Sequence, residues 1–273
     1  MTPAEYRVLP DSCDIYFFKN LDAKEASVRM VTQADGTLKK EKGLVGGGKP
    51  GSIYDTHLTE ASVEKVGKFT QEVIHQVAQN DLGRKSISAV YSSPMKRSKH
   101  SIEPLAKQLG LPCQEDGRID ELNHGQAMRN AGPDWKKTPY WETYSKLSRL
   151  QKLTTAQGPG ADTNCQVIDR MKAFAFDVAE KNLGKAVVCC AHDGAMRALL
   201  NLQNIEQVYG QIIGKQPSEN AVHALQGKDG IKLPEALHFT EGKMLHIRVY
   251  PSAGKIEIIK SEANKEGTVK SGK

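Results

Sequence analysis

The segment SISAVYSSPMKRSKHSIEPLAKQLG, residues 86–110, decides the fold of this chain. Residues 86–91 form a short, mostly apolar run, which predicts a buried strand. In the turn that follows, Ser93 is expected to cap a helix and Pro94 to take the first helical position. That helix is expected to bury one apolar face and to end at Gly110. A strand that leads directly into a helix is the repeating unit of α/β proteins.

The same order of strand and helix recurs on both sides of this segment. A buried strand is predicted at residues 15–18, and a continuous apolar strand at 186–191 precedes a helix over 195–202. The other expected elements are a helix from residue 59, a helix over 165–182, and a closing hairpin of strands 244–250 and 255–260. This alternation predicts a three-layer α/β/α sandwich with a mostly parallel central sheet.

The length of 273 residues suits one large α/β domain. We expect a single domain over residues 1–260, with insertions at about residues 21–58 and 125–160. The second insertion contains both tryptophans of the chain. Residues 261–273 are polar and are expected to form a disordered tail.

The charge of the chain is mildly basic, with a formal net charge of +6. An evenly charged, solvated surface accounts for this value, and so does a preference for anionic ligands such as phosphate esters. Nucleic acid is not expected as a partner, because no aromatic residues interleave the one dense basic run, residues 39–42. The five cysteines include no C-x-x-C pair, and the sequence has neither a secretory leader nor an apolar stretch of membrane-spanning length. We therefore expect a cytoplasmic protein without a membrane partner.

Neither a metal nor a cofactor is expected. No two histidines have the spacing of a recognised metal-ligand motif. Residues 43–49 fit the phosphate-loop pattern G-x-x-x-x-G-K, but Pro50 stands where that motif needs a serine or threonine hydroxyl. No apolar strand precedes this segment, so a glycine-rich loop is the better interpretation.

Polar side chains follow the predicted strands at the points where the strands end. Lys19 and Asn20 follow the first strand. Ser93 follows the second, and Arg97 lies about one helical turn later. His192 follows the third. Because ligands of parallel sheets bind outside the carboxyl ends of the strands, and because helix N-termini favour phosphate, these residues predict an anion site.

Four segments resemble motifs of the histidine phosphatases, the phosphoglycerate-mutase-like superfamily. Residues 89–106, AVYSSPMKRSKHSIEPLA, look like the family's YSSPxxRxxxTxEPLA segment. Residues 191–197, AHDGAMR, are similar to its second-histidine motif, SHGGxxR. IDELNHG at 119–125 resembles the segment that carries the family's acid, and DTHLTE at 55–60 resembles the entry to its first helix. The matches follow the family's order, and they imply a phosphoglycerate-mutase-like fold.

The first strand departs from the family's pattern. The family places Arg-His-Gly after this strand, and its histidine becomes phosphorylated, whereas this chain has Lys19-Asn20-Leu21. Lysine keeps the positive charge without the bidentate fork of arginine. An asparagine amide nitrogen has no available lone pair, so it cannot form an intermediate like phosphohistidine. The Arg-His-Gly motif is therefore degenerate at its nucleophile position.

The resemblance assigns roles to the matching residues. Arg97 corresponds to a phosphate-binding arginine, and His192 to the histidine that helps to hold the transferring phosphoryl group. Glu121 corresponds to the general acid, with its neighbour Asp120 as a rival for that role. The expected phosphate-binding residues are Lys19, Ser93, Arg97 and His192, and the expected catalytic positions are Asn20, Glu121 and His192.

Three functions are consistent with this pattern. The first is a pseudophosphatase that binds a phosphorylated small molecule or phosphoprotein and turns over little or nothing. The second is an active phosphomonoesterase, a phosphoric monoester hydrolase in which His192 is the nucleophile or a histidine such as His57 directs water. The third is an interaction scaffold whose contact surface is the insertion at 125–160. The sequence identifies neither the leaving group nor the oligomeric state, and it does not show whether His124 or His223 lies near the site.

Overall fold

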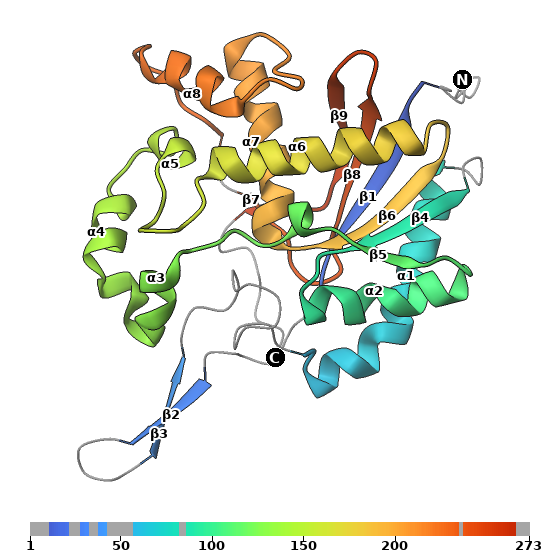
Figure 1. Ribbon diagram of the computed structural model, residues 1–273, viewed down its shortest axis with the longest axis horizontal. Helices are drawn as coiled ribbons and strands as arrows, with labels where there is room; N and C mark the ends of the chain where they lie inside the picture. The colour runs from blue at the N-terminus through green and yellow to red at the C-terminus, as the bar shows by residue number, and fades with distance from the viewer. Residues whose placement is uncertain are drawn as a thin grey trace.

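A six-stranded sheet forms the centre of the fold, as seen in a computed structural model (Figure 1). The structure describes residues 11–21, 28–32, 38–42, 57–81, 86–234 and 237–265. The strands lie in the order β5 (Cys113–Glu115), β4 (Ile87–Ser92), β6 (Ala186–Ala191), β1 (Cys13–Lys19), β8 (Met244–Tyr250) and β9 (Lys255–Ser261). The first four are mutually parallel, and β8 runs antiparallel to both β1 and β9. The prediction of a mostly parallel sheet is therefore confirmed.

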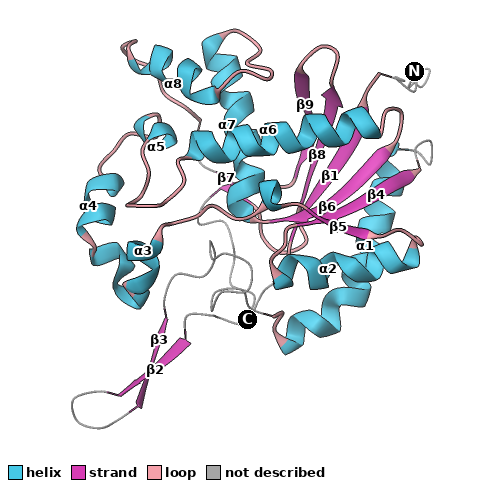
Figure 2. Cartoon of the chain, in the orientation of Figure 1, coloured by secondary structure: helices cyan, strands magenta, loops and turns pink. Residues whose placement is uncertain are grey.

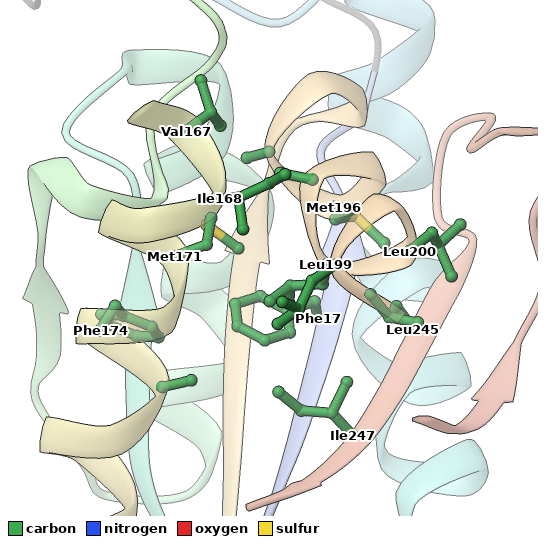
Figure 3. Close-up of a cluster of buried hydrophobic side chains, with 14 of the residues drawn as sticks. Phe17, Val167, Ile168, Met171, Phe174, Met196, Leu199, Leu200, Leu245 and Ile247 are labelled. Atoms are coloured by element: carbon green, nitrogen blue, oxygen red, sulfur yellow. The ribbon is translucent and has the colours of Figure 1, made fainter. Parts of the chain in front are cut away.

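Helices cover both faces of the sheet and complete the three layers (Figure 2). Helices α6 (Asn164–Lys181) and α7 (Asp193–Tyr209) pack on one face, and α1 (Glu60–Asp81) and α2 (Lys96–Gln108) pack on the other. Strand β1 shows why its sequence is continuously apolar: Phe17 joins the first layer, while Tyr16 and Phe18 join the second. Figure 3 shows Phe17 among side chains of α6 and α7.

The turn between β4 and α2 differs from the prediction. The helix begins at Lys96 with Met95 as its cap residue, so Pro94 precedes the helix and does not occupy its first position. Ser93 is therefore not the cap residue of α2; its hydroxyl accepts a hydrogen bond from the Met95 N–H at 3.1 Å and contacts other side chains of the candidate site. A hydroxyl with these partners is not available to the first turn of the helix.

The two predicted insertions contain short elements. Within residues 21–58, β2 (Val28–Thr32) pairs with β3 (Leu38–Lys42) in an antiparallel hairpin. Residues 22–27, 33–37 and 43–56, including the glycine-rich loop, lie outside the described residues. The segment from 117 to 154 holds the 3₁₀ helices η1 (Gly117–Ile119) and η2 (Gly132–Lys137) and the short helices α3 (Gln126–Asn130), α4 (Pro139–Ser145) and α5 (Gln151–Thr154). In Figure 1, α3, α4 and α5 lie at the left of the view, apart from the six-stranded sheet.

The C-terminal region is more structured than the sequence predicted. Helix α8 (Ser218–Gln226) was not predicted, and β9 continues to Ser261. Strand β10 (Asn264–Lys265) pairs with β7 (Leu237–His238). A disordered tail therefore does not begin at residue 261, because backbone pairing fixes the chain as far as 265. Residues 266–273 lie outside the described residues. No helix in the described part is long and apolar enough to cross a membrane.

Candidate functional site

The candidate site lies at the carboxyl ends of three neighbouring strands, β4, β6 and β1. Just beyond these ends, the N–H of Asn20 donates to the carbonyl oxygen of Ala191 at 3.0 Å. The N–H of Ser93 donates to the carbonyl oxygen of Cys190 at 3.1 Å. His192 directly follows β6, the strand between the other two. Ser93, His192 and Asn20 therefore follow three neighbouring strands and lie at the same edge of the sheet.

A chain of hydrogen bonds links His192 to a buried carboxylate. The Nε2 atom of His192 lies 2.8 Å from the hydroxyl oxygen of Ser93, and that oxygen lies 2.5 Å from Oδ1 of Asp120. The single hydroxyl proton of Ser93 goes to the carboxylate, so His192 donates from Nε2 to the serine oxygen. This assigns the Nε2–H tautomer and leaves a lone pair on Nδ1 of His192. That Nδ1 atom is buried and has no hydrogen-bond partner among the described residues.

Positive charge surrounds His192, whose exposed fraction is 1%. Burial, followed by the charges of Arg97, Lys19 and Arg170, holds the pKa of His192 well below its usual range. Arg97 is itself only 4% exposed. Burial raises the pKa of Asp120, against the opposing effects of the Ser93 hydrogen bond and the two arginines. A buried cluster of this kind is typical of a place where an anion is held.

The lowered pKa of His192 predicts a pH-dependent stability. Its folded pKa lies below its unfolded value of about 6.5, so the unfolded chain takes up a proton that the folded chain resists. The free energy of unfolding should therefore fall by up to about 1.4 kcal/mol per pH unit below pH ~6.5 from this group, and the effect should be absent above it. Urea titrations from pH 5 to pH 8 should show this extra slope in the wild type and not in His192→Gln. Equal slopes in the two proteins would contradict the prediction.

Asn20 is buried, and its side chain is fixed by the backbone that follows it. The exposed fraction of Asn20 is 4%, and its Nδ2 donates to the carbonyl oxygen of Leu21 at 2.6 Å. Leu21 packs in the apolar layer beneath α1 and α2, and its N–H donates to the Ser101 hydroxyl at 3.0 Å. Nearby, Nζ of Lys19 donates to the carbonyl oxygen of Asn20 at 3.4 Å. The loop after β1 is therefore built into the core through Asn20 and Leu21.

The side-chain carboxylate of Glu121 lies at the N-terminus of α7. Its Oε1 accepts hydrogen bonds from the N–H groups of Leu122 and Gly194, each at 2.9 Å. The positive end of a helix dipole stabilises a carboxylate in this place. A β-carbon at Gly194 would lie 2.2 Å from this oxygen, so any larger residue there would displace the Glu121 carboxylate. The group that approaches Gly194 closely is the carboxylate of Glu121.

Asp193 connects α7 to the strand β7. Its carboxylate accepts from the Phe239 N–H at 2.7 Å and from Nδ1 of His238 at 3.0 Å, and Nε of Arg197 lies 3.2 Å away. Burial favours the neutral form of Asp193, but the His238 hydrogen bond and Arg197 outweigh it and lower its pKa. These contacts tie the residue next to His192 to the segment that contains β7.

The other histidines named from the sequence lie in three different places. His57 stacks on His100 with ring centroids 5.1 Å apart, His124 contacts Gln157 at 2.6 Å, and His223 lies exposed on α8. Within the described ranges, no three His, Cys, Asp or Glu side chains gather as a metal ion would require.

Two contributors to the site had weak signals in the sequence. Asp120 was visible only as a rival of Glu121, and its link to Ser93 depends on side-chain direction. Arg170 gave no signal, because an arginine on an amphipathic helix normally faces solvent. In the structure its guanidinium donates to the carbonyl oxygens of Arg118 and Glu121, at 2.6 and 3.0 Å, and so ties α6 to the segment that carries Glu121.

The sheet order defines the class of an α/β protein with a mostly parallel sheet, whose carboxyl edge carries the charged residues described above. The family is identified by a sequence comparison. The family model of the histidine phosphatase superfamily (branch 1) matches residues 48–211 of this chain. Since this match covers more than half of the chain, the protein belongs to the histidine phosphatase superfamily.

Individual relatives agree with this assignment. Phosphoserine phosphatase 1 of Hydrogenobacter thermophilus is 23% identical over 157 residues, which are 56% of this chain and 66% of that protein. The chain thus spans slightly less than two thirds of the length of this relative.

Solved structures share the fold at low identity. Mycobacterial glucosyl-3-phosphoglycerate phosphatase superposes with a TM-score of 0.57 at 14% identity, covering 93% of this chain and 100% of that one. A phosphoserine phosphatase of Entamoeba histolytica, solved with 3-phosphoglyceric acid, gives a TM-score of 0.52 at 10% identity, covering 93% of this chain and 98% of the other.

Proposed function

We propose that this protein binds a phosphate ester, or a phosphorylated partner, at the carboxyl ends of β1, β4 and β6, and that its turnover is impaired because Asn20 replaces a nucleophilic histidine. One observation carries the proposal: a buried, neutral His192 on which the charges of Lys19, Arg97 and Arg170 act. A phosphate dianion would neutralise this positive field and accept hydrogen bonds from the same cations. Asn20 binds its own backbone and offers no lone pair for attack on phosphorus.

The relatives support a small phosphate ester as the ligand class. One solved neighbour holds 3-phosphoglyceric acid and another holds inorganic phosphate. Both are compact anions of the size that a cluster of two arginines and a lysine can surround. A phosphoprotein would present the same dianion, so the phosphate group is the shared chemistry.

Thermal denaturation with phosphate and vanadate tests the binding. At about 100 times its dissociation constant, phosphate should add about 2.7 kcal/mol and so raise Tm by about 5 °C or more. Arg97→Met should lose this ligand-induced rise. Lys99→Met is the matched control, because Lys99 lies on the same helix but pairs with Glu115 at the surface. If neither anion raises Tm in the wild type, the site does not bind phosphate and the interaction-scaffold hypothesis gains.

A second candidate function, an active phosphomonoesterase, is favoured by the lone pair on Nδ1 of His192. Ser93 and Asp120 polarise the opposite ring nitrogen, an arrangement that raises the nucleophilicity of an imidazole. An aryl phosphate assay from pH 4 to pH 9, run beside His192→Ala, separates the two candidates. Activity that disappears in the variant would support an active phosphomonoesterase with a replacement nucleophile at this site. No activity in either protein, with phosphate still raising Tm, would support a binding protein.

A further inference from the structure

The two ring nitrogens of His192 differ in their hydrogen bonding. The Nε2 atom lies 2.8 Å from the Ser93 hydroxyl oxygen, whereas the Nδ1 atom is buried and has no hydrogen-bond partner among the described residues. The exposed fraction of the whole residue is 1%. A buried polar atom without a partner is costly and rare in folded proteins, so it calls for a functional explanation.

The hydroxyl of Ser93 has no bonding position left for a ligand. It donates to Oδ1 of Asp120 at 2.5 Å, and its oxygen accepts from the Met95 N–H at 3.1 Å and from Nε2 of His192. Since a hydroxyl has one proton and two lone pairs, these three contacts use all of them. Ser93 and Asp120 therefore hold the proton on Nε2, and Nδ1 is the ring nitrogen with which His192 can meet a ligand.

Charged groups surround His192 on several elements of the fold. They are Lys19 at the end of β1, Arg97 on α2, Arg170 on α6, Asp120 and Glu121 after η1, and Asp193 at the start of α7. The Glu121 carboxylate binds the backbone N–H groups of Leu122 and Gly194, and that of Asp193 binds the segment of β7. Asp120 is the carboxylate that reaches His192 through hydrogen bonds, by way of Ser93.

A phosphate dianion and a neutral Nδ1 atom do not form a hydrogen bond, because both offer only lone pairs. A proton on Nδ1 would turn their contact into a charge-assisted hydrogen bond. In the free protein, burial and the charges of Arg97, Lys19 and Arg170 oppose this proton and lower the pKa of His192. A bound dianion would offset the three cations and raise that pKa. Anion binding and protonation of His192 should therefore favour each other.

We propose that His192 holds the phosphate group through Nδ1 and takes up a proton as the ligand binds, with Asp120 as the positioning residue that keeps the other proton on Nε2. The negative charge of Asp120 also stabilises the imidazolium that forms. The inference rests on the proposed function and requires binding only, without turnover. It specifies the ligand-bound site as one that contains one proton more than the free protein and the free dianion together.

Calorimetric titration with sulfate measures this proton directly. Sulfate has the shape and charge of a phosphate dianion, but it takes up no proton of its own near neutral pH. Titrations at pH 7 in two buffers of different ionisation enthalpy give the number of protons taken up per sulfate, which we expect to be about 0.5 or more. The affinity for sulfate should also rise about tenfold or more from pH 8 to pH 6, since one proton gives at most about tenfold per pH unit.

Two glutamine variants identify the group that takes up the proton. His192→Gln should bind sulfate without proton uptake, and its affinity should not change over this pH range. His223→Gln is the matched control, because His223 is an exposed histidine on α8, and this variant should behave like the wild type. If His192→Gln takes up as much proton as the wild type, another group such as Asp120 is the acceptor and the inference is wrong.

The ¹⁵N chemical shifts of the His192 ring give a test that needs no variant. In the free protein we expect a proton on Nε2 and none on Nδ1, and with saturating sulfate we expect a proton on both. A ring that keeps an unprotonated nitrogen in the complex would contradict the inference, whatever the variants do.

Asp120→Asn tests the positioning role. Loss of the negative charge disfavours the imidazolium, so the rise in sulfate affinity from pH 8 to pH 6 should shrink to about threefold or less, while the affinity at pH 8 should not fall. A merely structural role would weaken binding at every pH. Asp177→Asn is the control, because Asp177 pairs with Arg118 at the surface. An unchanged pH profile in Asp120→Asn would remove Asp120 from the proposal.

Failure of this inference can be distinguished from failure of the proposed function. Sulfate binding without proton uptake in the wild type would overturn the inference and leave the proposed function standing. If neither sulfate nor phosphate binds to the folded protein at any pH from 6 to 8, the proposed function itself fails.

Discussion

A Lys19→Arg/Asn20→His variant is expected to hydrolyse an aryl phosphate at least about 10³ times faster than the wild-type chain, because losing a covalent nucleophile commonly costs up to about 10⁶ in rate. The imidazole nitrogen of the new histidine would attack the phosphorus, while Arg97 and His192 hold the phosphoryl group. Steady-state release of the aryl alcohol measures the rate, and trapping a phosphorylated protein would identify the intermediate.

The geometry at Asn20 explains why one imidazole should suffice. The Nδ2 atom of Asn20 donates to the carbonyl oxygen of Leu21, and the Nδ1 atom of a histidine is attached to the same side-chain carbon. A histidine in this position would donate from Nδ1 to the same oxygen and keep its lone pair on Nε2. The backbone thus already selects the tautomer that a nucleophile needs.

The matched control for this variant is Lys19→Arg/Asn20→Gln, which retains the arginine and an amide but has no imidazole. It should be as inactive as the wild type. If the histidine variant is folded, binds phosphate and is still no faster than this control, the remaining residues are not a competent phosphatase site.

Replacing Asp14 by alanine should lower the free energy of unfolding by about 3–5 kcal/mol, the usual cost of leaving a buried charge without its partner. Asp14 on β1 is fully buried. Its carboxylate accepts hydrogen bonds at 2.9 Å from Nε2 of His246 and from Nε of Arg248, both on the neighbouring strand β8. Denaturation in guanidinium chloride measures the change.

An exposed ion pair serves as the control. Glu241→Ala removes a surface partner of Lys65, and such a pair is worth at most about 1 kcal/mol. A loss below about 1 kcal/mol in Asp14→Ala as well would mean that water reaches Arg248 and His246 at little cost. The prediction of a buried electrostatic link between β1 and β8 would then be wrong.

The sequence predicted the elements that are long, apolar and buried. Strand β6 has the predicted bounds, residues 186–191, because a strand covered on both faces must be apolar throughout. It did not predict β5, whose three residues include two exposed ones, or the full length of α7, which continues to Tyr209. Gly210, with a φ of +74°, ends α7. The sequence alone did not predict that the helix continues as far as this glycine.

The candidate site was predictable as far as backbone topology extends. Parallel strands bring Asn20, Ser93 and His192 to one edge, whatever their side chains do. Side-chain direction was not predictable, so the link from His192 through Ser93 to Asp120 emerged only in the structure. The same holds for Glu121, whose carboxylate lies at the start of α7. The phosphate-binding and catalytic roles that the resemblance implies for these residues stay predictions, which the experiments above test.

The burial of Leu21 limits which substitutions the loop after β1 can accept. A leucine in the apolar layer contributes about 2–5 kcal/mol, a large part of the stability of a typical domain. A glycine at this position would leave a cavity and loosen the loop. Mutations that depend on the packed leucine would accumulate, and each would make the reverse step more harmful. Packing at this loop would therefore act as an evolutionary ratchet, because a change of residue 20 to histidine leaves Leu21 in place, whereas a change of Leu21 to glycine removes a packed side chain.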